Sequence, residues 1–335
     1  MRLLILLVSF SLFSCDQHNV GTMLFTNFDD EFKLNHHVKI FNPHYFGKGT
    51  ILNFANDKLF IQDIYSTDSI VVVYSTKSFK KIGNIGVYGE EPGHILQPGR
   101  LTFSRDKKKL FLVDNAKGHI SSYDIDSALN NQNYLSSNHI NYPSEVFVSF
   151  ISHIEDKTFI TRQLDINNDL LLKFKSESIV DTIGKWYSTD DPIVLMDSFT
   201  QYYYAPFKHP TQEKYVSVYN HYDVIQITDS IGNSIFAIGP EKISYKDIKY
   251  EYLTYSWTHT SEDYIFAAYQ GQEFRSELST SFNKIHVFDW KGKPIAKFDL
   301  DIPIVNFAID VDSNIIYAIA DNENRDFVTF DFPKL

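Results

Sequence analysis

The sequence contains a single cysteine, Cys15, among its 335 residues. No disulfide can form within one chain, so the fold has to be stabilised by its apolar core. After Phe13, the sequence also lacks any apolar run near the roughly 20 residues that a membrane-spanning helix requires. These two absences exclude a disulfide-based scaffold and a helical membrane span beyond the N-terminal segment.

Positive charge is scarce, with 31 Lys and Arg residues against 42 Asp and Glu residues and a formal net charge of −11. Such a surface repels nucleic acid and anionic lipid headgroups, so we expect no nucleic-acid partner. The only dense basic run, Lys107–Lys109, falls where we expect a solvated turn.

Signatures of common catalytic and metal sites are also missing. No phosphate-binding Walker loop, G-x-S-x-G nucleophile elbow or paired zinc ligands occur. The adjacent His36 and His37 would point to opposite faces of a strand. Segments 165–169 and 310–314 alternate oxygen-bearing side chains as calcium loops do, but both lack the glycine and closing glutamate of an EF-hand. Because Asp and Asn are also favoured in turns, we expect turns there and no resident metal or cofactor.

The N-terminus has the form of an export signal. Met1-Arg2 precedes the apolar run Leu3–Phe13, which has the proportions of a secretory signal. Leu12-Phe13-Ser14-Cys15 resembles a bacterial lipobox, whose cysteine is acylated and becomes the new N-terminus. We therefore expect a signal peptide over 1–14, a lipidated N-terminus and tether over 15–29, and attachment to the cell envelope at the outer membrane. An ordinary signal peptide or a buried N-terminal strand is the alternative.

A short apolar strand following an acidic turn recurs six times, at a period of about 50 residues, which is typical of a β-propeller with one blade per repeat. The strand centres are Phe60, Phe111, Phe159, Val216, Phe266 and Tyr317. The sequence thus predicts an all-β, six-bladed β-propeller with four antiparallel strands per blade, as one domain over 30–335.

The first repeat shows the expected blade most clearly, with strands over 50–54, 58–62, 69–74 and 80–85. The sixth repeat ends at Phe332-Pro333, before a fourth strand. The segment 31–40 precedes the first blade and is expected to supply that missing outer strand, which would close the ring and remove an open sheet edge. Residues 241–253 are the best candidate for a helix or an irregular loop.

The segment Gly86–Pro98 resembles the Gly-rich linker between blades of NHL-type and TolB-like propellers. With the lipobox, residues 1–332 resemble the TolB-like six-bladed propeller lipoproteins of Bacteroides and its relatives. The resemblance implies this fold and export, and it implies no catalytic residues. The glycines of the linker are expected to form a structural turn between blades.

A polar residue follows the second strand of every repeat. Because these strand ends meet the linkers between blades on one rim, their side chains could surround a ligand on the axis; turn formation is the alternative reason for them. The candidates are Asp63, Asp114, Arg162, Asn220 with His221, Gln270 and Asp321. Arg162 could bind a carboxylate. Arg275 is added because it lies in the longest such loop, 270–283. Aromatic residues 202–204 and 257–259 are expected on or beside innermost strands, where core packing or sugar stacking would explain them.

Two functions remain open. The first is a membrane-anchored binding or scaffold module for a protein, peptide or glycan in the envelope, acting as a monomer. The second is a propeller enzyme of the lactonase or lyase type, with a divalent cation on the axis held by Asp63, Asp114, Asn220 and Asp321. The absence of catalytic motifs favours the first.

Overall fold

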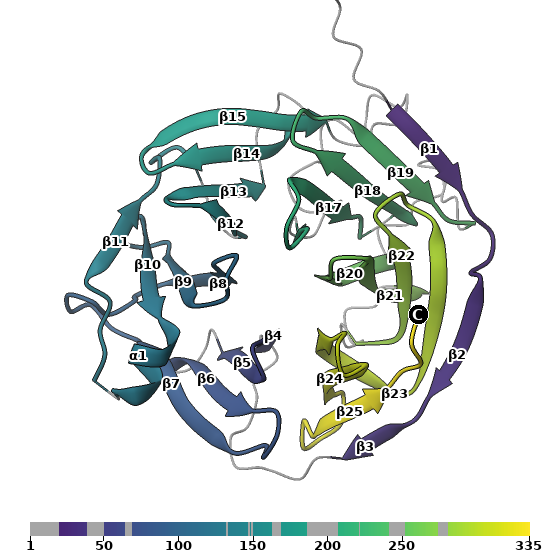
Figure 1. Cartoon of the computed structure of the whole chain (residues 1–335), viewed down its shortest axis with the longest axis horizontal. Coiled ribbons are helices and arrows are strands. Elements are labelled where there is room, and N and C mark those ends of the chain that lie inside the picture. The colour runs from purple at the N-terminus through teal and green to yellow at the C-terminus, as the bar shows by residue number, and fades with distance from the viewer. Residues whose placement is uncertain are drawn as a thin grey trace, which may run out of the picture.

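The computed structural model describes residues 20–38, 50–63, 69–131, 133–146, 148, 150–162, 169–185, 207–220, 222–240, 252–273 and 281–335. Its strands form six blades around a central axis (Figure 1). In the first four blades the strand order follows the chain from the axis outward, and neighbouring strands of one blade are antiparallel. The predicted all-β propeller is confirmed.

Blade 1 contains β4 (Thr50–Ala55), β5 (Lys58–Asp63), β6 (Ser69–Ser75) and β7 (Lys81–Val87). Blade 2 contains β8 (Pro98–Phe103), β9 (Lys109–Asp114), β10 (His119–Asp124) and β11 (Asn138–Asn141). Blade 3 contains β12 (Ser152–Glu155), β13 (Thr158–Arg162), β14 (Asp169–Lys175) and β15 (Ser178–Lys185). Blade 4 contains β16 (Phe207–Lys208), β17 (Lys214–Val218), β18 (Val224–Asp229) and β19 (Ser234–Ile238).

Blades 5 and 6 share one long strand. Blade 5 contains β20 (Tyr252–Thr260), β21 (Tyr264–Glu273), β22 (Phe282–Asp289) and the first half of β23 (Pro294–Asp310). Blade 6 contains the second half of β23, β24 (Ile315–Ala320), β25 (Phe327–Asp331) and β3 (His36–Val38). The outer strand of one blade thus continues directly as the innermost strand of the next. All six predicted strand centres lie on second strands.

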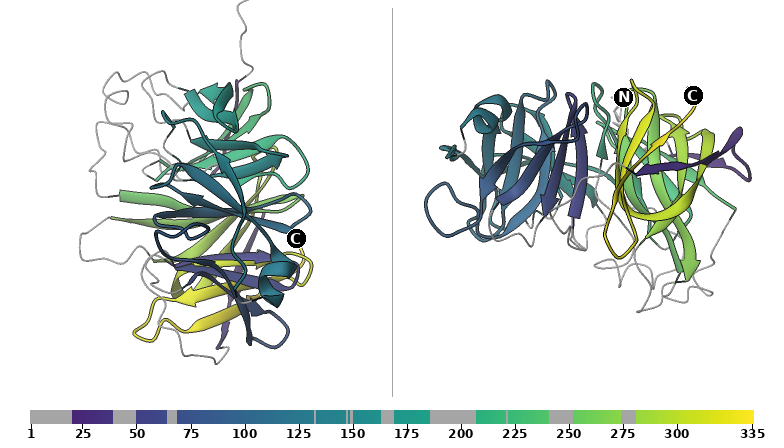
Figure 2. Two further views of the ribbon diagram at one scale, coloured as in Figure 1. Left: turned by 90° about the vertical axis from the view of Figure 1, so that its left-hand side faces the viewer. Right: turned by 90° about the horizontal axis from the view of Figure 1, so that it is seen from below.

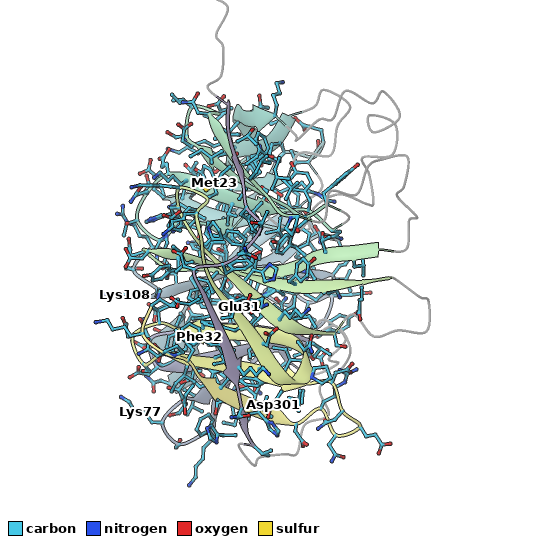
Figure 3. The ribbon with its side chains drawn as sticks, turned by 90° about the vertical axis from the view of Figure 1, so that its right-hand side faces the viewer. Met23, Glu31, Phe32, Lys77, Lys108 and Asp301 are labelled. Atoms are coloured by element: carbon cyan, nitrogen blue, oxygen red, sulfur yellow. The ribbon has the colours of Figure 1, made fainter. Side chains whose placement is uncertain are left out.

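The N-terminal residues 20–38 form a strap along the outside of three blades (Figures 2 and 3). β3 pairs antiparallel with β25, which confirms that the N-terminal region closes the last blade. The predicted closing strand, 31–40, is nevertheless too long. β2 (Asp30–Leu34) pairs instead in parallel with β23 and adds a fifth strand to blade 5.

The strap also begins earlier than expected. β1 (Val20–Leu24), within the segment expected to be a tether, pairs in parallel with β19 at the outer edge of blade 4. Phe25 then enters the core, where its ring lies 5.3 Å from that of Phe288. An ion pair between Lys297 and Glu31, at 2.9 Å, and a hydrogen bond between the side chains of His36 and Asp301, at 3.0 Å, fix the strap further. Hydrogen bonding of strands to the outer edges of blades 4, 5 and 6 covers three otherwise open edges.

The core lies between blades, and strand alternation builds it. In β5, Leu59 and Ile61 pack against blade 6, where they meet Tyr317 and other residues. Phe60, between them, points the other way and packs against Leu112 of blade 2. Successive side chains of a strand point to opposite faces, so each blade can bury both faces only when it has a neighbour on each side.

The Gly86–Pro98 segment is a turn between blades 1 and 2, as predicted. Ile95 is fully buried and its backbone N–H donates to the Val87 carbonyl at 2.9 Å. Gly86 has φ +77°, in the left-handed region, where a Cβ atom would come within 2.9 Å of Leu112. The Lys117 ammonium donates to the carbonyls of Glu91 and His94 at 3.1 and 2.8 Å, which holds the linker in place.

The described helix is α1 (Ile125–Asn130), between β10 and β11, where the sequence analysis expected none. Its N-cap is Asp124, whose carboxylate accepts the Ser127 N–H at 2.9 Å. Most of the predicted helix or loop at 241–253 lies outside the described residues, and its end belongs to β20. No helix within the described ranges has the length and apolar character needed to cross a bilayer.

Candidate functional site

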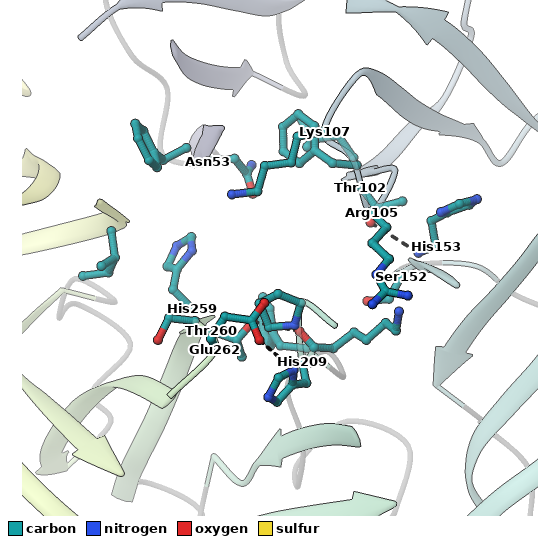
Figure 4. A pocket seen from close by; sticks show the side chains of 18 of the residues that line it. Asn53, Thr102, Arg105, Lys107, Ser152, His153, His209, His259, Thr260 and Glu262 are labelled. Carbon is teal, nitrogen blue, oxygen red and sulfur yellow. Dashed lines mark hydrogen bonds and ion pairs between the residues drawn. The ribbon is translucent and has the colours of Figure 1, made fainter. Parts of the chain in front are cut away.

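A pocket of about 580 Å³ lies on the propeller axis and is lined from all six blades (Figure 4). Its walls are the innermost strands, and its mouth opens among the turns that join first to second strands. These turns include 104–107 in blade 2, 261–263 in blade 5 and 311–312 in blade 6. We call this end of the propeller the hairpin face and the opposite end, where the linkers between blades lie, the linker face.

An arginine stacked between two aromatic rings lies among the residues lining the pocket. The Arg100 guanidinium carbon is 4.1 Å from the centroid of the Phe150 ring and 4.0 Å from that of the Trp257 ring. These residues belong to blades 2, 3 and 5, so the stack joins blades on different sides of the axis. A guanidinium is planar and weakly hydrated, which suits it to lie between two rings away from water.

One side of the pocket is basic. The hairpin between β8 and β9 carries Arg105 and Lys107, and Lys107 has φ +55°, in the tight turn itself. Blade 4 contributes Lys208, which is half-buried. Burial lowers the pKa of the Lys208 ammonium, and the nearby positive charge of Arg105 adds to the effect. Arg105 and Lys208 are therefore held near each other, with Lys208 partly removed from water, whereas the Lys107 side chain reaches toward Asn53 (Figure 4).

The other side of the pocket is acidic. Glu262 and Asp263 come from the turn after β20, Asp310 ends β23, and Asp312 comes from the turn after it. Glu262 accepts a hydrogen bond from the Thr211 hydroxyl at 2.6 Å. Asp310 is 6% exposed and accepts from the Ser313 N–H at 3.2 Å. Figure 4 shows Glu262 across the pocket from Lys107.

Three histidines lie among these walls, and burial lowers the pKa of each. His153 stacks on Phe111, with ring centroids 4.6 Å apart. His209 accepts the backbone N–H groups of Thr211 and Gln212 on Nδ1, both at 3.1 Å, so its proton is on Nε2. Burial lowers the pKa of His259 to about 4, and its Nε2 lies 2.8 Å from the Trp257 indole nitrogen. At neutral pH these imidazoles are uncharged, so the charge of the pocket comes from its lysines, arginines and carboxylates.

Hydrogen bonds between blades position the strands that line the pocket. The Thr260 hydroxyl donates to the Lys208 carbonyl at 2.8 Å, from blade 5 to blade 4. The Leu52 N–H donates to the Asn306 side-chain oxygen at 3.0 Å, from blade 1 to blade 6. These bonds fix the spacing of the first strands, and hence the distance between the basic and acidic walls.

The candidates from the sequence lie at the opposite end. Asp63, Asp114, Arg162, Asn220 and Asp321 end or follow second strands on the linker face, Gln270 lies near the end of β21, and none of the six lines the pocket. His221 and Arg275 lie outside the described residues, as do 202–204.

Two of these candidates have structural contacts. Asp114 is fully buried, and its carboxylate accepts four backbone N–H groups, from Leu96, Gln97, Ala116 and Lys117, at 2.9 to 3.3 Å. Asp321 pairs with Arg325 at 2.8 Å. These contacts fit the alternative of turn formation. The guanidinium carbon of Arg162 lies 6.0 Å from the centroid of the Phe150 ring.

Most residues of the pocket carry no distinctive sequence pattern, although two signals pointed to it. Lys107 and Lys108 of the basic run precede β9 in the expected turn and Lys109 begins that strand, but Lys107 lines the pocket instead of being only a solvated turn residue. Trp257 and His259 are on an innermost strand, as predicted, and also line the pocket. Among the described residues, no three His, Cys, Asp or Glu side chains are grouped so as to hold a metal ion.

The chain is similar in sequence to one protein family and in structure to several solved proteins. The family described as TolB-like 6-blade propeller-like matches residues 32–314. A structure of a DUF4221 family member from Bacteroides vulgatus aligns with a TM-score of 0.58 and 11% identity, covering 90% of this chain and 96% of that one. A Bacteroides fragilis protein named for its expected export aligns with a TM-score of 0.59 and 12% identity, covering 93% and 99%. No curated protein matches the sequence. At these identities the two structures show a shared fold only.

Proposed function

This chain belongs to the TolB-like six-bladed propeller family, and from that premise we propose that it is an exported, lipid-anchored binding module of the bacterial cell envelope. Its ligand is a peptide, a protein segment or a glycan. The observation that carries the proposal is the axial pocket, to which all six blades contribute and which contains both cations and carboxylates. Concave sites with a few charged groups among aromatic residues are typical of ligand binding.

The anchor is proposed from the lipobox-like Leu12–Cys15. One structural relative is named for its expected export, which supports this assignment. Two or three acyl chains on Cys15 would hold the protein on a membrane, while the strap would connect the anchor to blades 4, 5 and 6.

The strap also suggests an orientation. Val20 pairs with Ser234, which follows the turn between β18 and β19, so β1 begins at the hairpin face. Val20 is five positions after Cys15. At no more than about 3.6 Å per residue, the anchor would lie within roughly 18 Å of that face. A lipid on Cys15 would therefore hold the mouth of the pocket close to the membrane.

The enzyme alternative has less support. An axial cation of the kind envisaged needs free carboxylates, whereas Asp114 accepts four backbone N–H groups and Asp321 pairs with Arg325. These contacts favour binding over metal-dependent hydrolysis as the role of this propeller.

The proposal is tested in two steps. First, cells expressing the full chain or Cys15→Ala are labelled with radioactive palmitate and fractionated; we expect label and membrane association only with Cys15. Second, the purified propeller is screened on a glycan array and a random peptide library, alongside a Lys208→Glu, Glu262→Lys double variant. A ligand lost by the double variant supports the proposal. A soluble, unlabelled wild-type protein, or ligands that bind both forms equally, would contradict it.

A further inference from the structure

The charges around the axial pocket are balanced in number, and those of opposite sign come from different blades. Its lining contains four cationic side chains, Arg100, Arg105, Lys107 and Lys208, and four carboxylates, Glu262, Asp263, Asp310 and Asp312. The cations come from blades 2 and 4 and the carboxylates from blades 5 and 6. We propose that this pocket binds a small zwitterionic ligand, with its anionic group against the basic wall and its ammonium group against the acidic wall. This inference rests on the proposed binding function and names its ligand class.

The basic wall is suited to an anion because its mouth residues form no direct ion pair, although the more distant carboxylates of Glu213 and Glu155 also act on Lys208. Within the described ranges, the charged groups of Arg105, Lys107 and Lys208 form no ion pair with a carboxylate. Lys208 is half-buried and close to Arg105, and this environment lowers the pKa of its ammonium. A bound carboxylate or phosphate would relieve the repulsion between Arg105 and Lys208, which together can hold such an anion by charge-assisted hydrogen bonds.

The acidic wall is suited to an ammonium group for the same reason. In the described part of the chain no Lys or Arg forms an ion pair with Glu262, Asp310 or Asp312. The nearest ionisable partner of Glu262 is His209, at 3.9 Å, and burial lowers the pKa of that imidazole, so it is neutral near pH 7. A ligand ammonium would supply the missing positive charge.

The separation of the walls selects a ligand carrying both charges. A simple anion or a simple cation would be attracted to one wall and repelled by the other. A molecule with both groups is attracted at both ends, which gives specificity through charge complementarity. The pocket volume, about 580 Å³, falls in the usual range for small-molecule sites and accommodates a di- or tripeptide.

Two sources can supply this chemistry: a free short peptide, with its terminal carboxylate and amine, or a phosphoethanolamine headgroup, with its phosphate and amine. Both would reach a pocket mouth held near a membrane. The probes are therefore trialanine and O-phosphoethanolamine, each measured by isothermal titration calorimetry against the purified propeller at low salt, where charge interactions are least screened.

Charge-blocked probes test the two walls separately. We expect trialanine to bind at one site, and N-acetyl-trialanine and trialanine amide each to bind at least about tenfold more weakly, since each loses one charged contact. For phosphoethanolamine, the comparison is with ethanolamine and with inorganic phosphate. Whether trialanine or phosphoethanolamine binds best identifies the source, and either result supports the proposal.

Matched variants assign the walls. Lys208→Gln is expected to weaken trialanine about tenfold but to leave trialanine amide unchanged, while Glu262→Gln weakens trialanine but leaves N-acetyl-trialanine unchanged. Lys334→Gln and Glu323→Gln, both exposed and remote from the pocket lining, serve as controls for net charge. Circular dichroism and melting curves of each variant separate loss of binding from loss of folding.

The proposal is overturned if neither zwitterion binds, if blocking either charge has no effect, or if the variants bind like their controls. The proposed binding function is tested independently of this ligand class. If a glycan or longer peptide from the screen binds the pocket and is lost on charge reversal, the binding role holds and only the zwitterion inference falls.

Discussion

Arg100 and Trp257 stack across the propeller axis, with the guanidinium carbon of Arg100 4.0 Å from the centroid of the Trp257 ring. Arg100 lies on β8 in blade 2 and Trp257 on β20 in blade 5, opposite each other in the ring (Figure 1). These two strands belong to blades that are not neighbours in the ring and are joined here by side chains. The stack links blades 2 and 5 among the residues that line the axial pocket.

We expect Arg100→Ala to lower the free energy of unfolding by about 2 kcal/mol, because a desolvated cation–π contact is worth roughly that amount. Arg100→Lys should recover part of the loss, since an ammonium cannot stack on two rings as a planar guanidinium can. Urea unfolding followed by tryptophan fluorescence measures both. Equal stability of the alanine variant and the wild type would show that the stack has no energetic role.

Phe25 connects the strap to the core, and Phe25→Ala should destabilise the protein by about 3 kcal/mol, as large-to-small core substitutions do. Its neighbour Leu24 is 62% exposed, so Leu24→Ala is the matched control and should change stability by less than about 0.5 kcal/mol. Thermal and urea unfolding of both variants provide the comparison. If the two substitutions have the same effect, the strap contributes only its backbone pairing.

Asp114→Ala should cost about 3 kcal/mol, because four backbone donors lose their acceptor in a buried site. Asp114→Asn keeps one acceptor oxygen but places an NH₂ group against a backbone N–H, so an intermediate loss is expected. If Asp114 instead bound a ligand on the axis, both variants would weaken binding while leaving the melting temperature near that of the wild type.

Stability should fall as the pH falls below about 6.5, because buried histidines resist protonation. Burial lowers the pKa of His259 to about 4 and that of His286 well below 6.5. Between these values the unfolded chain binds protons that the folded chain does not, so stability present above pH 6.5 is lost as the pH approaches 4. For His259 the loss amounts to at most about 3 kcal/mol.

His259→Gln should therefore flatten the profile of unfolding free energy between pH 7.5 and pH 4.5. The exposed Ile231, which has no ionisable group, serves as a control, since Ile231→Gln should leave the shape of the profile unchanged. A wild-type profile that stays level, or one that falls equally in all three proteins, would contradict this role for His259.

Much of the fold could be predicted because its signals are local. Each second strand follows an acidic turn and contains an apolar run; before Lys58–Asp63 the turn residues Asn56 and Asp57 have φ of +49° and +56°. The closing role of β3 followed from the missing strand of the last repeat. β1 and β2 were not predicted as strands of blades 4 and 5, because parallel pairing with segments more than 200 residues away leaves no local pattern.

The site was harder to predict, because the local sequence around its residues is that of ordinary turns. Arg105 and Lys107 look like solvated turn residues, and Asp310 and Asp312 like turn formers. Asp114, by contrast, attracted notice as a polar residue after an apolar strand, and its carboxylate is occupied by the backbone. A polar side chain in a turn has the same local sequence whether it faces solvent, a backbone donor or a ligand.

The sequence alone determined that this chain forms a ring of six sheets, because hydrophobic alternation and turn residues act over a few neighbouring positions and recur with each blade. The tertiary structure decided which residues share the axis and which end of it carries charge. Lys107 and Glu262 are 155 positions apart (262 − 107), and they face each other only because closure of the ring brings the first strand of every blade to one centre.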